Sequence, residues 1–110
     1  MLIDFDSTNL ARALDAARNV RSVIFELRGA ATLTPNSAVR AVRSFEVAAA
    51  DEGSADVALL CQSLLAELDG VRRACISPGS FGGSAVERID SYMDELAERQ
   101  QINQKERMAA

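Results

Sequence analysis

The sequence contains no histidine and no tryptophan, and only four phenylalanines, one tyrosine, two prolines and two cysteines among its 110 residues. Without histidine the chain lacks the commonest general base and the commonest metal ligand of proteins. Strands favour β-branched and aromatic residues, whereas alanine and leucine favour helices. Because alanine is abundant and aromatic residues are scarce, the composition predicts one small all-α domain spanning residues 1–110, with a modest core.

The chain also has too little positive charge for a typical nucleic-acid-binding protein, since 16 acidic side chains outweigh 12 basic ones. We therefore expect nucleic acid not to be its main partner. No apolar run approaches the roughly 18 residues that a membrane span requires. The first residues, MLIDFD, are acidic where a secretory signal would be basic, so we expect synthesis in the cytoplasm, with signal-less export left open.

Apolar residues recur in steps of three and four in four segments, and each segment is expected to form a helix with one apolar seam. Short links between such segments favour an antiparallel helical bundle of about four helices. Residues 1–6 are expected to form an extended arm, and residues 100–110 a polar tail that is either helical or frayed. The four seams run from Leu10 to Leu27, from Ala38 to Ala49, from Val57 to Cys75 and from Val86 to Leu96.

Capping residues predict where these helices begin and end. Asp6 or Ser7 can cap the first helix, which should stop at Gly29. Thr34 followed by Pro35 is typical of a helix start. Gly53 favours a break between the second and third helices, although one long, bent helix through this glycine is the alternative.

A glycine-rich link covers residues 77–83 and precedes Ser84 and Glu87, which have the spacing of a capping box for the fourth helix. The link is expected to reverse the chain direction; binding an anion there is a weaker interpretation, because no lysine follows. Phe81 either fills the end of the bundle or is presented to a partner. Tyr92 is expected beside the fourth seam.

Cys61 and Cys75 lie on the same predicted seam, about 21 Å apart in a straight helix, so they cannot form a disulfide with each other. Two buried thiols are the expectation, and a disulfide between two antiparallel copies is the alternative. Glu87, Asp90 and Asp94 share a helix face, which we interpret as a solvated surface and not as a metal site. No cofactor is expected.

The arginines off the seams are expected to pair with neighbouring carboxylates. Arg40 and Arg43 permit a second interpretation, a small DNA-associated transcriptional regulator in which they read bases from a helix-turn-helix. The link from residue 29 to residue 34 is longer than the usual turn of that motif.

The outline of the chain resembles the small helical proteins of type VII secretion, the WXG-motif group. The resemblance lies in the length, the helical seams, the polar tail and the segment FGGS at residues 81–84 before a helix that contains Tyr92. The Trp-x-Gly motif is missing. Leu96 stands where the C-terminal export motif of that family has an acidic residue after Tyr92. The resemblance implies a secreted helical partner protein.

We therefore expect a non-enzymatic helical interaction module, an adaptor, small chaperone or secreted partner protein, which forms a homo-oligomer or pairs with a second helical chain. The seam from Val57 to Cys75 is so apolar that part of it is expected to await another chain. The residues expected at the contact are Leu60, Leu64, Leu68, Phe81, Tyr92 and Met93.

Overall fold

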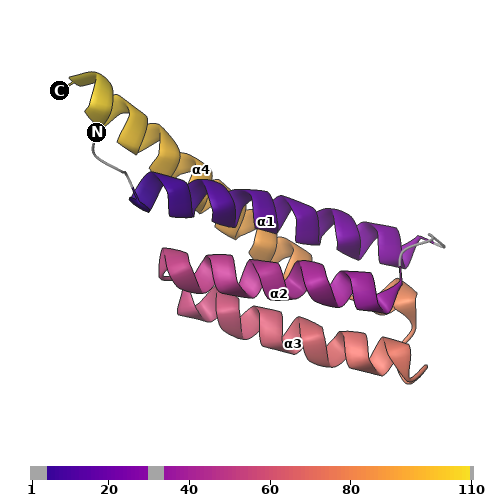
Figure 1. Cartoon of the computed structure of the whole chain (residues 1–110). Coiled ribbons are helices and arrows are strands. Elements are labelled where there is room, and N and C mark those ends of the chain that lie inside the picture. Colours follow the sequence, from indigo (N-terminus) through magenta and orange to yellow (C-terminus); the bar gives the residue numbers. More distant parts are fainter. Residues whose placement is uncertain (1–4, 30–33, 110) are drawn as a thin grey trace.

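The computed structural model describes residues 5–29 and 34–109, and in these ranges it confirms a small all-α bundle. The helices are α1 (Phe5–Arg28), α2 (Pro35–Glu52), α3 (Ala55–Arg72) and α4 (Ala85–Ala109), with a single 3₁₀ turn, η1 (Pro78–Ser80). In Figure 1, α1, α2 and α3 lie side by side with alternating directions, and α4 crosses behind them. α4 packs mainly against α1, and it makes few contacts with α3.

The molecule is elongated, with extents of 55 × 23 × 19 Å. The C-terminal half of α4 causes much of this length, because it projects past the end of the bundle (Figure 1). The polar tail is therefore a helical extension, as one of the two expectations had it. No helix in the described residues is long and apolar enough to span a membrane.

The predicted start of α2 is confirmed, whereas the predicted start of α1 is wrong. Thr34 has extended backbone angles, its hydroxyl accepts a hydrogen bond from the Ser37 N–H at 3.3 Å, and Pro35 is the first helical residue. α1 begins at Phe5 and not after a cap at Asp6 or Ser7, because each residue added to an existing helix gains a hydrogen bond at little cost. Residues 1–4 of the predicted arm, and residues 30–33 of the link, lie outside the described residues.

Gly53 separates α2 from α3, so the preferred break is confirmed and the single long helix is wrong. Its φ is +100°, a left-handed conformation that glycine adopts without steric cost. The Gly53 N–H contacts the carbonyls of Ala49 and Ala50, and the Ser54 N–H donates to Ala49 O at 2.9 Å. These bonds satisfy the last carbonyls of α2, which ends the helix.

α3 passes through Gly70 as expected, but it ends at Arg72 and not at Cys75. Ala74 adopts a left-handed φ of 61°, and the N–H groups of Cys75 and Ile76 donate to the Gly70 carbonyl at 2.8 and 3.2 Å. A Cβ at Gly70 would lie only 2.6 Å from Ile76 Cδ1. Because Gly70 has no side chain, Ile76 can pack directly against it. The chain turns back at this point because the contact partly buries the apolar side chain of Ile76.

The seam positions form one core. All predicted seam residues of α1 and α2 are buried, and α3 buries its seam as far as Val71, covered by other parts of the same chain. Cys75 is exposed, so only one of the two thiols, that of Cys61, is buried. Tyr92 is 1% exposed and contacts the ring of Phe45, with centroids 5.9 Å apart, so it lies within the seam and not beside it.

The glycine-rich link closes one end of this core. Phe81 is fully buried, which agrees with its interpretation as a plug. Arg28 ties the link to the end of α1: its Nε donates to the Phe81 carbonyl at 2.6 Å and its Nη2 to the Gly83 carbonyl at 3.4 Å. α4 then begins at Ala85, directly after Ser84, as the sequence predicts.

Candidate functional site

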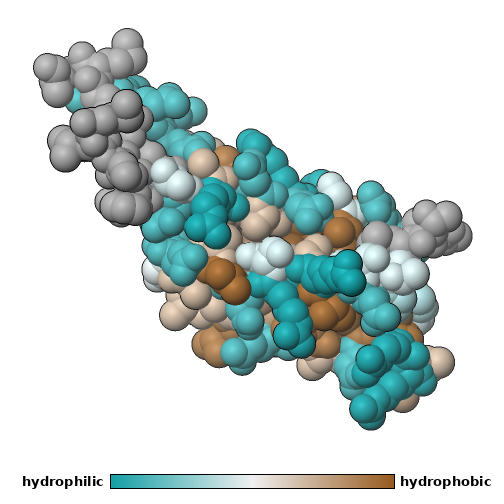
Figure 2. Space-filling model, viewed as in Figure 1, coloured by the Kyte–Doolittle hydropathy of each residue, from teal (hydrophilic) through white to brown (hydrophobic). Residues whose placement is uncertain are grey.

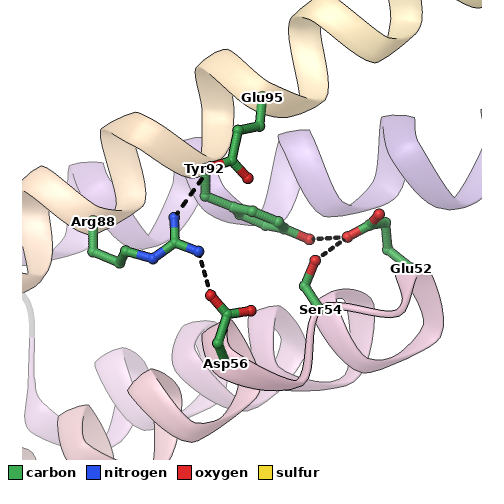
Figure 3. A network of polar contacts seen from close by, with 6 residues as sticks. All are labelled: Glu52, Ser54, Asp56, Arg88, Tyr92 and Glu95. Carbon is green, nitrogen blue, oxygen red and sulfur yellow. Dashed lines mark hydrogen bonds and ion pairs between the residues drawn. The ribbon is translucent and has the colours of Figure 1, made fainter.

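A network of polar side chains fastens α4 to the turn between α2 and α3 (Figure 3). Glu52, whose side chain is 4% exposed, accepts hydrogen bonds from Tyr92 Oη at 2.7 Å and from Ser54 Oγ, and it forms an ion pair with Arg99. Ser54 stands at the start of α3, but its hydroxyl makes no cap hydrogen bond there, because it points to Glu52. This carboxylate is therefore fully used in holding three helices together.

Arg88 extends the network along α4, where it pairs with Asp56 and lies 3.8 Å from Glu95 (Figure 3). The hydrogen bond from Arg88 holds the pKa of Asp56 below its usual value. Burial raises the pKa of Tyr92 above its usual value, so its hydroxyl stays a hydrogen-bond donor at neutral pH. The lowered pKa of Asp56 stabilises the folded bundle at neutral pH, and neither shift prepares a group for proton transfer.

A cavity of about 340 Å³ lies beside this network, between the start of α1 and the α4 extension. Several of its polar groups already have partners: Asn9 Nδ2 donates to the Asp51 carbonyl at 3.3 Å, and Glu52 is bound to Arg99. A polar ligand that bound to Asn9 or Glu52 would have to break these pairs. Within the described residues no group of three or more Cys, Asp or Glu side chains is placed to hold a metal ion.

The acidic face of α4 does not converge on one point. Asp90 Oδ1 accepts a hydrogen bond from Arg21 Nε at 2.7 Å, which ties α4 to α1, while Glu87 and Asp94 are exposed. Among the arginines of α1, Arg18 lies 3.8 Å from its neighbour Asp15, as the sequence predicts. Arg21 reaches across to another helix and does not pair with a neighbour on its own.

The two cysteines differ in chemistry. The Cys61 thiol is fully buried in the core, and burial raises its pKa from the ordinary 9.0 to about 12. Cys75 is exposed in the turn after α3. Since the thiolate is the reactive form of cysteine, only Cys75 is available to solvent reagents in the folded protein.

We expect a thiol-reactive dye at mildly alkaline pH to label one cysteine at once and the second only as the protein unfolds. In Cys75→Ser the fast reaction should vanish. Because the unfolded Cys61 ionises near pH 9.0 and the folded one near 12, the contribution of Cys61 to stability should be constant below pH 9 and fall as the pH rises between these values. Fast labelling of both thiols in the native protein would contradict this assignment.

Apolar side chains remain exposed on both helices of the α2–α3 hairpin. Val47 on α2 is 53% exposed and Leu59 on α3 is 62% exposed, while Val39 and Leu65 are only partly covered. We call these four residues the hairpin face. Figure 2 shows brown and tan residues gathered over α2 and α3, with hydrophilic residues between them. The bundle thus leaves part of this hairpin uncovered.

A groove of about 230 Å³ opens at one end of this face, between the start of α2 and the end of α3. Its apolar residues are Val39, Leu65 and Leu68, and Leu68 is 1% exposed at its floor. Polar residues complete its rim: Asn36, Arg43, Asp69 and Arg72.

Arg43 and Arg72 against Asp69 give the rim of the groove a small positive charge, and Arg40 and Arg73 lie next to rim residues in the sequence. Asp69 pairs with both Arg72, at 2.6 Å, and Arg73, at 3.2 Å. Arg40 and Arg43 are exposed on α2, and neither is in an ion pair with any residue that the structure describes. This cationic excess contrasts with the net charge of −4 of the whole chain.

The residues predicted to contact a partner lie mostly inside the fold. Leu64, Leu68, Phe81 and Tyr92 are at most 1% exposed, so a partner cannot touch more than an edge of them while the bundle is closed. Leu60 and Met93 are partly buried against the core.

Sequence reasoning did not predict the groove. Val39 and Leu65 each lie one position after a buried residue, at the edge of the apolar stripe. Such flanking positions signal a helix face wider than its core seam. Which flank is covered depends on the neighbouring helices, so the signal cannot be read from one helix alone.

No family model, curated protein or solved structure matches the chain. The resemblance to the WXG-motif proteins of type VII secretion therefore stays a prediction.

Proposed function

We propose that this protein is a helical protein–protein interaction module that binds a second copy or another helical chain through the hairpin face. The observation that carries the proposal is the exposure of Val47 and Leu59 on a hairpin whose other side is covered by α4 and α1. Full burial of an apolar side chain of this size contributes about 1.5–3 kcal/mol. Val47 and Leu59 are already partly covered, so each contributes part of this amount when a partner helix covers it, and the groove beside them adds further apolar surface.

The network around Glu52 supports the same proposal, because it makes the hairpin a rigid platform. The turn between α2 and α3 is bound to α4 through Tyr92 and Arg99. A surface held in one conformation loses little conformational entropy when it binds.

A DNA-associated regulator is the second candidate, and the observation that favours it is the free charge of Arg40 and Arg43. Against it stand the net charge of −4 and the apolar groove between the arginines of α2 and those of α3. Phosphates gain nothing from an apolar surface, whereas an amphipathic helix uses both features.

The test combines sedimentation of the purified chain over a wide concentration range with capture of partners on the immobilised chain, each captured protein being purified and titrated back. The double variant Val47→Ser/Leu59→Ser should weaken the resulting complex, homo-oligomer or hetero-complex, by about tenfold or more, since each tenfold step corresponds to 1.4 kcal/mol. Both residues are surface-exposed, so circular dichroism should show an unchanged fold.

Ile102→Ser is the matched control, because Ile102 is 47% exposed but lies on the α4 extension. It should leave the complex unchanged. A chain that stays monomeric and captures nothing, or a complex that the hairpin variant leaves intact, would overturn the proposed function.

A further inference from the structure

We propose that the groove between α2 and α3 binds an acidic amphipathic helix, whose apolar side chain enters the groove while its carboxylates pair with Arg40 and Arg43. This inference rests on the proposed function and specifies the chemistry of the partner. It follows from the size of the groove, the nature of its floor and the charge of its rim.

The size of the groove suits a side chain and not a whole small molecule. Its volume of about 230 Å³ lies below the 300–1,000 Å³ or so that is typical of small-molecule pockets. Val39, Leu65 and Leu68 make the floor apolar, so a polar group that entered would lose its water without gaining a hydrogen bond there. An apolar side chain pays no such cost.

The shape of the surface favours a helix as the carrier of that side chain. Val39, Arg43 and Val47 follow each other at intervals of four, so they form one stripe along α2. A partner helix lying along the hairpin would place apolar anchors one or two turns apart, one in the groove and the next against Val47. This is the usual way in which a helix binds a groove between helices.

The charge of the rim selects acidic side chains beside the anchor. Arg72 and Arg73 already share Asp69, but Arg40 and Arg43 have no such partner in the described residues. Glu46, one turn beyond Arg43, is half-buried and forms no ion pair with Arg43. A carboxylate that arrives at Arg43 therefore gains a two-pronged ion pair without displacing an existing one.

The experiment uses three fluorescent probes with the full chain: an amphipathic helical peptide with leucine anchors flanked by glutamates, the same peptide with lysines in place of the glutamates, and a short DNA duplex. Anisotropy at low salt should show the glutamate peptide binding at least about tenfold more tightly than the lysine peptide, with the preference shrinking as salt is added. Chemical shifts should change at Val39 and Leu65.

Arg40→Glu/Arg43→Glu should reverse the preference, so that the lysine peptide binds more tightly. Arg18→Glu is the control, since Arg18 is exposed on α1 and pairs only weakly, at 3.8 Å, with Asp15. It should leave the preference unchanged. Val39→Ser should weaken both peptides, because it acts on the apolar floor.

Equal binding of the two peptides, binding of neither, or selective binding of the duplex would overturn the inference. The proposed function fails separately. If neither peptide binds but Val47→Ser/Leu59→Ser still dissociates a complex of this chain, the hairpin face is an interface and only the inference of an acidic partner helix is wrong. If that double variant changes no complex, the proposed function itself is lost.

Discussion

Phe45→Ala is expected to lower the free energy of unfolding by about 3–5 kcal/mol, the loss that truncation of a buried phenylalanine typically causes. Phe45 is fully buried at the centre of α2 and contacts the Tyr92 ring of α4. The helix supplies few other large residues, since its remaining core positions are alanine or valine. Neighbouring side chains therefore have little volume with which to refill the cavity.

A loss of this size removes a large fraction of the total stability of a small domain, which is about 5–15 kcal/mol. The midpoint of thermal unfolding should fall by roughly 10 °C or more, measured by circular dichroism or calorimetry. Because Phe45 contacts Tyr92 of α4, the whole bundle should unfold cooperatively at a lower temperature, and the loss should not be confined to fraying of one helix.

Phe25→Ala is the matched control. Phe25 is 45% exposed on α1, with the guanidinium groups of Arg21 and Arg28 5.0 and 5.4 Å from its ring centre. Such exposed cation–π contacts contribute about 0.5–1 kcal/mol each, so this variant should lose far less stability than Phe45→Ala. Equal losses in the two variants would mean that α2 does not form the centre of the core.

Gly82→Ala is expected to cost roughly 2–5 kcal/mol, from two effects that act on the same atom. The φ of Gly82 is +81°, and a left-handed conformation costs a residue with a Cβ about 1–2 kcal/mol. The added Cβ would also lie 2.8 Å from Ile24 Cγ2. Ile24 is fully buried in the core and cannot move aside without disturbing its neighbours, so overpacking adds about 1–3 kcal/mol.

The adjacent Gly83→Ala provides an unusually close comparison, because a Cβ at Gly83 meets nothing within 4 Å and its φ is not left-handed. Denaturant unfolding should therefore show a large loss for Gly82→Ala and almost none for Gly83→Ala. Comparable values would show that the link does not pack on α1 as described.

The helices themselves were predictable because their signals are local. A stripe of apolar residues must be covered by something, whatever covers it, so the seam positions could be identified before their partners were known. Thr34 with Pro35 and Gly53 with its αL conformation act within one turn of the chain. Their effects on α2 therefore follow from the sequence alone.

The end of α3 and the position of Tyr92 were not predictable, because they depend on contacts from elsewhere in the chain. α3 ends early because Ile76 packs on Gly70. A glycine in a helix does not by itself indicate which residue will pack against it. Tyr92 is a core residue because Glu52, 40 positions earlier, accepts its hydroxyl hydrogen bond. A polar aromatic at the edge of a seam gives no hint of that acceptor.

The candidate site shows the same division. The sequence by itself determined that the chain forms amphipathic helices, each with an apolar stripe that must be covered by another helix. Only the tertiary structure decided which surface stays uncovered: α4 lies over α1 and the inner side of the hairpin, so the α3 seam is buried and Val47, Leu59 and the groove remain outside. The reason is that the burial of a side chain depends on how helices pack against each other, whereas hydrophobic periodicity can be read from the sequence of a single helix.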